Sequence, residues 1–305
     1  MRRLRRWVIG WPALLVLGSC AQQGYRPVEQ VPVAALEPPQ PAPPPVPASP
    51  GRFVYGGTLS QGGLIRGSAP AGTTLLTLDG RPIPVAPDRG FLIGFDRDAG
   101  PVARLVATLS DGRQVSELLQ VARRDWNISR LSSLPKIPVP APQFDQLRPR
   151  ELAEINSART QQVFSEGWRQ DFLWPAVGRI STLFGSQRVY ANGEAGSYHS
   201  GIDVAKPTGS IVLAPADGVV TLASDRPFTL EGNLLIVNHG NGLDSAFMHL
   251  SRIDVRPGER VRRGQPLGLV GATGRATGPH LHWGLRWGSA RIDPLLVAGP
   301  MPVAD

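Results

Sequence analysis

Two short groups of histidine and carboxylate side chains in the last third of this chain have the composition of a metal site. His199 precedes Asp203 by four residues in a segment whose glycine and β-branched residues favour a strand, which would place both side chains on one face. His280 and His282 stand two apart, and a strand would again turn both to one face. Two strands that each present such a pair could supply three ligands and one open position, as a tetrahedral catalytic zinc site requires.

Neither pattern is specific when taken alone. His199 and Asp203 could form a salt bridge, and His280 and His282 could be two exposed imidazoles. The cysteine content narrows the chemistry, because one Cys in 305 residues excludes a disulfide scaffold, an iron–sulfur cluster and any zinc site with two or more thiolates. A transition metal in this chain must therefore be held by histidine and carboxylate.

The sequence around these residues resembles the lysostaphin-type, or LytM-type, zinc endopeptidases, which hydrolyse bacterial cell walls. The resemblance begins at Gly178 and ends at Trp283, and its motifs occur in the order that the family has. The segments that carry it are Gly178–Gly185, His199–Ala205, Ala214–Val220, Val237–Gly242, Phe247–Leu250, Gly264–Gly268 and Gly271–Trp283.

This resemblance implies a set of site residues, and every position of the set is filled here. It implies that His199, Asp203 and His282 bind one Zn2+ per chain, and that His280 and His249 are catalytic residues beside the open coordination position. We expect His280 to accept the proton of the attacking water and to return it to the leaving amine. His249 would orient that water or stabilise the developing oxyanion, although the two roles could be exchanged.

Two other positions in these motifs receive non-catalytic interpretations. We assign His239 a structural or outer-shell role. Phe247 stands where the family often has Tyr, a departure that should affect packing more than catalysis. Because the two catalytic histidines should titrate near neutrality, we predict that activity falls below about pH 6, as they become protonated and zinc ligation weakens.

The elements that must position these residues are mainly β. The resemblance implies that residues 176–298 form an antiparallel β domain with a zinc groove, and the glycines that separate short apolar runs there agree with tight turns. Residues 51–122 predict a small accessory β-sandwich of six or seven strands, with hairpin turns at Asp79-Gly80 and Asp111-Gly112. This segment has no His and no Cys, so we expect it to dock a partner, for example an envelope protein, rather than to catalyse.

A Pro-rich connector and one helix should join the two regions over residues 123–175. Pro149 is suited to the first turn of that helix, Leu152, Ile155 and Val163 fall near one face, and Gly167 is a candidate C-cap. We expect the helix to pack against the domain that follows it. Residues 299–305 are interpreted as a tail.

The N-terminus predicts export. Residues 1–19 have the layout of a signal peptide, with four arginines before a short apolar run. The only cysteine, Cys20, ends a Leu-Gly-Ser-Cys sequence that resembles a bacterial lipobox, so we predict lipidation at Cys20, with an ordinary signal peptide or an uncleaved anchor as the alternatives. Residues 20–50 form a Pro-rich tether. The protein would then work in the periplasm or at the outer membrane, held to the membrane by the lipid anchor or the signal segment.

Taken together, these features predict a zinc endopeptidase that hydrolyses the peptide crosslinks of bacterial peptidoglycan, of the D-alanyl–diaminopimelate type, with the peptide stems as its substrate. The alternative is a non-catalytic envelope protein of the same fold that binds peptidoglycan or activates a cell-wall amidase.

Other classes of protein are excluded by single features of the sequence. A biotinyl or lipoyl carrier would need a lysine at a hairpin tip, and neither Lys136 nor Lys206 occupies one. A phosphotransferase domain of similar fold would be cytoplasmic, whereas the N-terminus of this chain predicts export. The net charge of +8 includes +4 from residues 1–19, and no nucleic-acid partner is expected, because basic and aromatic residues do not cluster.

Overall fold

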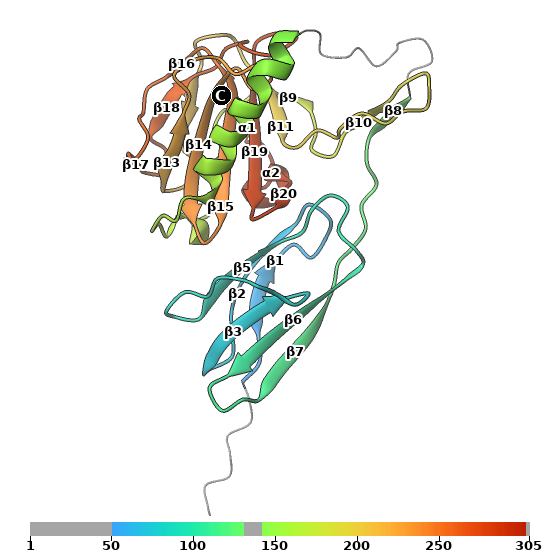
Figure 1. The fold of residues 1–305 in the computed structure, drawn as a ribbon, viewed down its shortest axis with the longest axis vertical. Helices are drawn as coiled ribbons and strands as arrows, with labels where there is room; N and C mark the ends of the chain where they lie inside the picture. Colours follow the sequence, from blue (N-terminus) through green and yellow to red (C-terminus); the bar gives the residue numbers. More distant parts are fainter. Residues whose placement is uncertain (1–50, 131–141, 303–305) are drawn as a thin grey trace, which may run out of the picture. The chain divides into compact units, whose positions relative to one another are not determined.

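The computed structural model describes residues 51–130 and 142–302, and the fold is mainly β, as the sequence predicts (Figure 1). The signal segment, Cys20 and the Pro-rich tether lie outside the described residues, as do the last residues of the tail. Within the described ranges, no helix combines the length and the apolar character needed to cross a membrane. The domain boundaries stated above remain predictions.

Seven strands between residues 54 and 120 form two small antiparallel sheets. The three-stranded sheet has the order β1-β2-β5 and consists of β1 (Val54–Gly57), β2 (Leu64–Ser68) and β5 (Gly90–Gly94). The four-stranded sheet has the order β4-β3-β6-β7 and consists of β3 (Thr73–Leu78), β4 (Arg81–Pro82), β6 (Val102–Leu109) and β7 (Gln114–Gln120). The apolar faces of the two sheets share one core, which includes Ile65, Leu76, Phe91, Leu105 and Leu119. This pairing is the small β-sandwich that the alternating sequence pattern predicts.

The two predicted hairpin turns differ in geometry. At the β3–β4 turn, Asp79 and Gly80 have φ of 49° and 76°, as a two-residue turn with positive φ at both positions requires. At the β6–β7 turn, Gly112 has φ of 82°, whereas Asp111 keeps the ordinary negative φ. The Asp111 side chain instead accepts a hydrogen bond from the backbone N–H of Arg113, so that only the glycine adopts the left-handed conformation there.

An eight-stranded antiparallel sheet dominates the C-terminal region. Its order is β17-β13-β14-β15-β19-β11-β9, with β20 paired to β19. The strands are β9 (Arg179–Thr182), β11 (Ile202–Ala205), β13 (Gly218–Ala223), β14 (Asn233–Gly240), β15 (Leu243–Leu250), β17 (Arg260–Val261), β19 (His280–Trp287) and β20 (Ala290–Ile292). Smaller elements complete the region: β12 (Ile211–Leu213), β16 (Arg252–Ile253) and β18 (Pro266–Leu269) form a three-stranded sheet, β8 (Ile128–Arg130) pairs in parallel with β10 (Gln187–Val189), and η1 (Gly167–Arg169) and α2 (Pro294–Ala298) are short helices.

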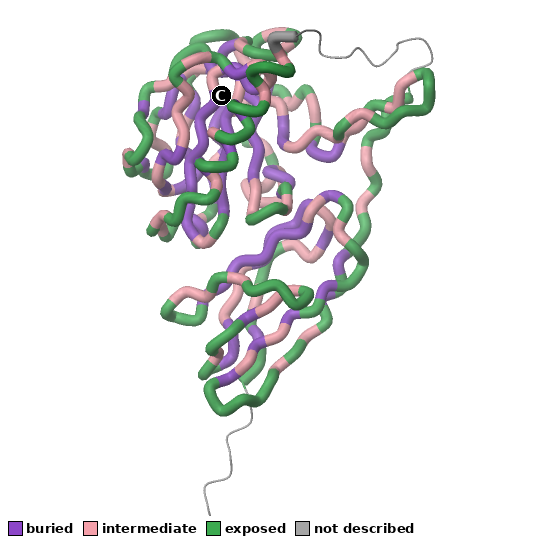
Figure 2. The backbone as a smooth tube through the Cα atoms, viewed as in Figure 1, coloured by how far each residue is buried: buried purple, intermediate pink, exposed green. Residues whose placement is uncertain are grey.

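The central strands of this sheet are buried on both faces (Figure 2). On one face, Leu235, Phe247 and Trp283 belong to the main core of the C-terminal region. On the other face, Ile236 and Ala246 pack against the long helix α1 (Pro142–Thr160). Burial on both faces explains why Leu234–Val237 of β14 form a continuous apolar run rather than an alternating one, whereas β15 also buries Asp244 and Ser245.

The position of α1 corrects the predicted helix boundaries. The helix begins at Pro142, so that Pro149 lies inside it rather than in its first turn, and it ends at Thr160, well before Gly167. Gly167 serves packing instead of capping, because a Cβ there would lie 1.8 Å from the carbonyl oxygen of Asp217. As expected, the helix packs on the domain that follows it, where Ile155 is buried, although Leu152 is exposed.

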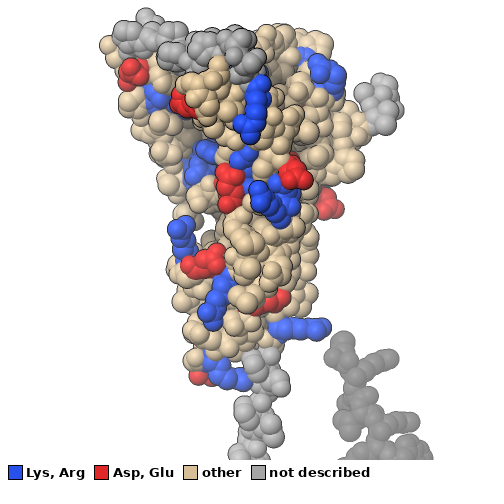
Figure 3. Space-filling model, turned by 90° about the vertical axis from the view of Figure 1, so that its right-hand side faces the viewer, with Lys and Arg blue, Asp and Glu red and all other residues tan. Residues whose placement is uncertain are grey.

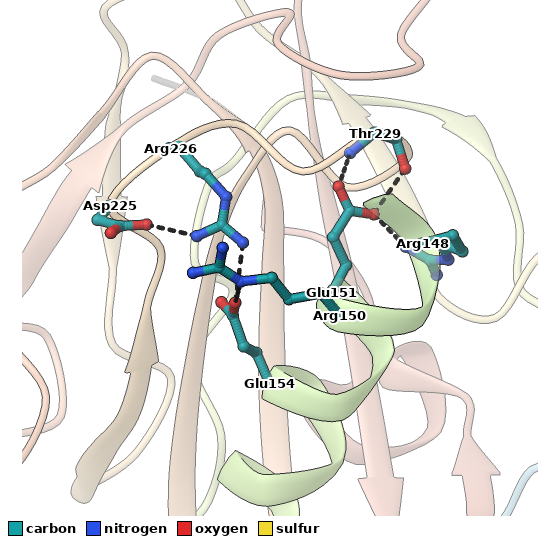
Figure 4. A network of polar contacts seen from close by, with 7 residues as sticks. All are labelled: Arg148, Arg150, Glu151, Glu154, Asp225, Arg226 and Thr229. Atoms are coloured by element: carbon teal, nitrogen blue, oxygen red, sulfur yellow. Dashed lines mark hydrogen bonds and ion pairs between the residues drawn. The ribbon is translucent and has the colours of Figure 1, made fainter. Parts of the chain in front are cut away.

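Tertiary contacts hold α1 on both sides of Pro149. The Arg148 guanidinium binds both carboxylate oxygens of Glu231 at 2.7 and 2.8 Å, and it also contacts Glu151. The Glu151 carboxylate accepts hydrogen bonds from the N–H and the hydroxyl of Thr229 (Figure 4). These buried contacts tie the helix to the β13–β14 loop, and they explain why the helix continues through a proline that the local sequence pattern would place at its start.

Candidate metal centre

Three side chains that the sequence predicts as ligands meet at one point of the large sheet. His199 Nε2, Asp203 Oδ1 and His282 Nδ1 form a triangle in which each pair of atoms is 2.9 Å apart. Asp203 and His282 stand directly opposite each other in the ladder between β11 and β19. The strand pattern therefore brings a carboxylate and an imidazole together from segments 79 residues apart.

His199 reaches the same point by a different route from the one that we predicted. It lies before β11 rather than on it, so strand alternation does not explain why it shares a side with Asp203. Backbone hydrogen bonds orient it instead: its N–H donates to Ser186 O, and its own carbonyl accepts from the N–H of Gly185. Its Nδ1 lies 3.1 Å from the carbonyl oxygen of Leu183, which makes Nδ1 the protonated nitrogen and leaves the lone pair on Nε2.

His282 is buried and presents Nδ1 to the other two ligands. Burial lowers the pKa of His282, which favours the neutral imidazole that a metal ligand must be. Its Nε2 has no hydrogen-bond partner among the described residues, and it faces the backbone of Gly201, where a Cβ would lie only 2.8 Å away. Gly201 thus leaves the space that the His282 ring occupies.

Asp203 is ionised in this arrangement. Burial by itself would raise its pKa, but the hydrogen bonds and charges of His199 and His282 outweigh that effect and hold the pKa well below the usual range. Two imidazoles and one ionised carboxylate, converging from three sides, are a donor set that fits a divalent transition metal.

Two further histidines border the ligands. The His249 and His280 rings are 4.8 Å apart between centroids, and His280 Nε2 lies 3.8 Å from Asp203 Oδ1. Each ring bonds a backbone carbonyl through Nδ1, His249 to Thr273 O and His280 to Gly278 O, both at 2.8 Å, which leaves Nε2 as the acceptor nitrogen. Burial lowers the pKa of His249 to about 4, so that this ring stays neutral at physiological pH, and the expectation that it titrates near neutrality is wrong.

His249 is held in an uncommon backbone conformation at the end of β15. Its φ of 63° is rare for a residue with a Cβ, and its N–H donates to the carbonyl of Glu231. Glu231 is the residue that Arg148 of α1 binds. The strain and the hydrogen bond together fix the direction in which the imidazole leaves the strand.

His239 lies apart from this group, in the core. It is fully buried, its ring packs edge-on against Phe172, and its nitrogens bond Asp217 O and Ser245 Oγ, each at 2.8 Å. Burial lowers the pKa of His239 to about 4. These contacts agree with the structural role assigned to it from the sequence.

Gly201 and Thr273 also shape the site, although neither was predicted to have a role there. Gly201 acts through the absence of a side chain, and Thr273 acts through its carbonyl oxygen, so residue type alone gave no indication of either function. Both residues lie inside the motifs that carry the family resemblance. Their place in those motifs is the feature of the sequence that could have identified them.

The surface charge of the molecule is mixed. On the face drawn in Figure 3, basic and acidic side chains alternate among a majority of uncharged residues. No continuous basic stripe of the kind that nucleic acids require is visible on that face.

Comparison with known proteins identifies the region that carries this group. The model of peptidase family M23 matches residues 197–294. The chain is 42% identical over 107 residues to the peptidoglycan DD-endopeptidase ShyA of Vibrio cholerae, covering 35% of this chain and 24% of that protein. It is 40% identical over 124 residues to the DD-carboxypeptidase/endopeptidase Mpg of Neisseria meningitidis, covering 41% of this chain and 28% of that protein. The chain thus spans about a quarter of the length of these curated relatives.

A solved structure resembles a larger part of the chain. A crystal structure of a candidate M23 peptidase from Pseudomonas aeruginosa superposes with a TM-score of 0.60 and 28% identity, and the match covers 79% of this chain and 96% of that one. The similarity therefore includes elements outside the family-matched segment.

Proposed function

Because residues 197–294 form a metallopeptidase domain of family M23, we propose that this chain is a zinc-dependent endopeptidase that hydrolyses the peptide crosslinks of bacterial peptidoglycan. The observation that carries the proposal is the convergence of His199, Asp203 and His282, with His249 and His280 at their side. Zinc held by the first three residues would activate a water molecule and polarise the scissile carbonyl.

The two remaining histidines supply the proton transfers. His280 lies beside Asp203, and its acceptor nitrogen Nε2 is the candidate to take the proton of the attacking water and to return it to the leaving amine. His249 is neutral and buried, and its Nδ1–H donates to Thr273 O, so its Nε2 can accept a hydrogen bond from the attacking water and orient it. Their backbone hydrogen bonds restrict both rings before substrate binds, which reduces the ordering needed in the transition state.

We also propose which crosslink the chain cleaves and where in the cell envelope it works. The relatives named as DD-endopeptidases support peptide stems of peptidoglycan as the substrate, and we propose the D-alanyl–diaminopimelate crosslink. The signal-like segment and Cys20 support a lipid-anchored protein of the periplasm or outer membrane. An envelope protein that binds the small N-terminal sheets remains a proposed partner.

The experiment that tests this function is mass spectrometry of the fragments that the zinc-loaded full chain releases from purified sacculi. We expect crosslinked fragments to be converted to uncrosslinked ones by the wild type and not by His282→Ala. Absence of products together with absence of bound zinc would refute the enzyme and favour the non-catalytic, peptidoglycan-binding alternative.

A second comparison separates ligands from proton-handling residues. His280→Ala and His249→Ala should keep zinc in elemental analysis and lower kcat by about 10²- to 10⁴-fold, the usual range for a lost general acid–base. His199→Ala should lose zinc as well. Retention of full activity in both His280→Ala and His249→Ala would contradict the assigned roles.

A further inference from the structure

The loop that carries His199 is held by residues outside the family-matched segment. His199 lies between β10 and β11, where its backbone exchanges hydrogen bonds with residues 185 and 186. The side chains that hold this loop in turn come from the turn after β5, in the small N-terminal sheets. We propose that Asp96 and Arg97 of that turn are positioning residues for the metal centre, an inference that rests on the proposed zinc peptidase function.

Asp96 binds the residue next to the ligand. Its Oδ1 accepts a hydrogen bond from the hydroxyl of Tyr198 at 2.8 Å, and its Oδ2 accepts one from the backbone N–H of Arg291, also at 2.8 Å. Arg291 belongs to β20, which pairs with the ligand-bearing strand β19. One carboxylate therefore connects the loop of His199 to the sheet that carries His282.

Arg97 binds the other side of the same loop. Its side chain is only 8% exposed, its Nε donates to the carbonyl of Gly185 at 3.1 Å, and its Nη2 donates to Gln187 Oε1 at 3.1 Å. The guanidinium lies 4.9 Å from the centre of the Tyr198 ring, in cation–π contact. A buried arginine with this many directed contacts is a rigid support, because each contact restricts the same planar group.

The connection from Arg97 to the ligand passes through the backbone of one residue, Gly185. The Gly185 carbonyl accepts from Arg97, and the Gly185 N–H donates to the carbonyl of His199 at 2.9 Å. Leu183, two residues earlier, supplies the carbonyl that bonds His199 Nδ1 and so selects the metal-facing nitrogen. Moving this loop would therefore change both the position and the tautomer of the ligand.

These contacts differ from those of a simple docking surface. Apolar residues of the small sheets, Leu64 and Leu92, pack into the main core of the C-terminal region and form an apolar docking contact. Asp96 and Arg97 add directed polar contacts at the loop that carries His199, the ligand that lies before β11 rather than on a strand. Outer partners of metal ligands are known to set metal affinity in this manner.

The test compares zinc affinities of full-chain variants by competition with a chromogenic chelator, and the absorption spectrum of the Co2+-substituted proteins. Tyr198→Phe removes one of the two hydrogen bonds that Asp96 accepts, Asp96→Asn leaves one acceptor oxygen for the two donors, and Arg97→Lys keeps the charge but loses the planar fork. Asp111→Asn is the matched control, because the hydrogen bonds that this carboxylate makes in the described part of the chain stay within its own β6–β7 turn. Each of the first three variants should bind zinc about tenfold more weakly, the low end of the range for outer partners, with a changed Co2+ spectrum. The control should match the wild type.

A double variant provides a stricter criterion. Asp96→Asn combined with Tyr198→Phe should weaken zinc binding by less than the product of the two single effects, because both changes act on the hydrogen bond between Tyr198 and Asp96. Zinc affinities and Co2+ spectra equal to the wild type, whether or not the melting temperature falls, would overturn the positioning role and leave these residues with docking alone. A wild type that binds zinc but leaves sacculi intact would reject the proposed function, while the zinc comparison still decides the role of Asp96 and Arg97.

Discussion

Replacing Gly201 by alanine should damage the metal centre without touching any ligand. A Cβ at position 201 would lie 2.4 Å from the carbonyl oxygen of Trp283, 2.8 Å from Nε2 of His282 and 2.9 Å from Cα of Gly284. All three atoms belong to β19, and two of them are backbone atoms, so no side chain can rotate away to relieve the worst contact. Either the strand segment around His282 or the backbone at position 201, which lies between His199 and Asp203, has to move.

The size of the movement follows from these distances. Relieving the contact with the Trp283 oxygen to 3.0 Å, the shortest separation that real Cβ atoms show, requires a displacement of about 0.6 Å. Metal–ligand distances tolerate only about 0.2 Å. We therefore expect Gly201→Ala to bind zinc about 10- to 100-fold more weakly, and to lose about 1–3 kcal/mol in the free energy of unfolding through overpacking.

The assay is chelator competition for zinc, with chemical denaturation of the metal-free protein measured in parallel. Gly100→Ala is the control, because a Cβ there meets nothing within 4 Å and the residue has no positive φ. Zinc affinity and stability that both equal those of the wild type would show that the strands accommodate a methyl group, and the claim that Gly201 makes room for His282 would be wrong.

Three other perturbations probe the surroundings of the site. Arg148→Ala should cost about 3–5 kcal/mol in the free energy of unfolding, because two buried carboxylates lose their partner, whereas Arg150→Ala, at an exposed pair, should cost under about 1 kcal/mol; thermal melts compare them. His239→Ala should destabilise by about 2–4 kcal/mol yet retain zinc in elemental analysis, since its bonds lie in the core. Burial raises the pKa of Asp244 to about 6, and no donor among the described residues hydrogen-bonds its Oδ1, although Arg159 lies 3.6 Å away. The folded protein then holds a proton that the unfolded chain releases, so stability from this group is full below about pH 4 and lost as pH rises through 6; Asp244→Asn should remove that slope from denaturation midpoints measured across the window.

Local patterns predicted the parts of the structure that neighbouring residues determine. Asp79-Gly80 forms the expected turn with positive φ at both positions, and the pairing of β11 with β19 brings Asp203 and His282 together as strand alternation suggests. In each case, the geometry follows from backbone preferences or from the two-residue period of a strand.

The rest depends on tertiary contacts that no local window contains. His199 was expected on a strand, but its position comes from hydrogen bonds with residues 183–186. The start of α1 was expected at Pro149, but Arg148 and Glu151 bind the β13–β14 loop and extend the helix past the proline. A pattern of residue types does not encode which distant carbonyl or carboxylate will be within reach.

Strand β19 shows how the core and the metal centre constrain each other. Its residues alternate: His280 and His282 face the site, while Leu281 and Trp283 belong to the core. A shift of one residue in register would turn both imidazoles into the core and move the tryptophan to the face of the metal site. Trp283 Nε1 donates to Ser245 Oγ, and His239 Nε2 bonds the same hydroxyl, so polar contacts within the core oppose that shift. A histidine remote from the chemistry thereby helps to keep two others in place. Histidine is thus a ligand on one face of this sheet and a core residue on the other. The contacts around each ring distinguish the two roles.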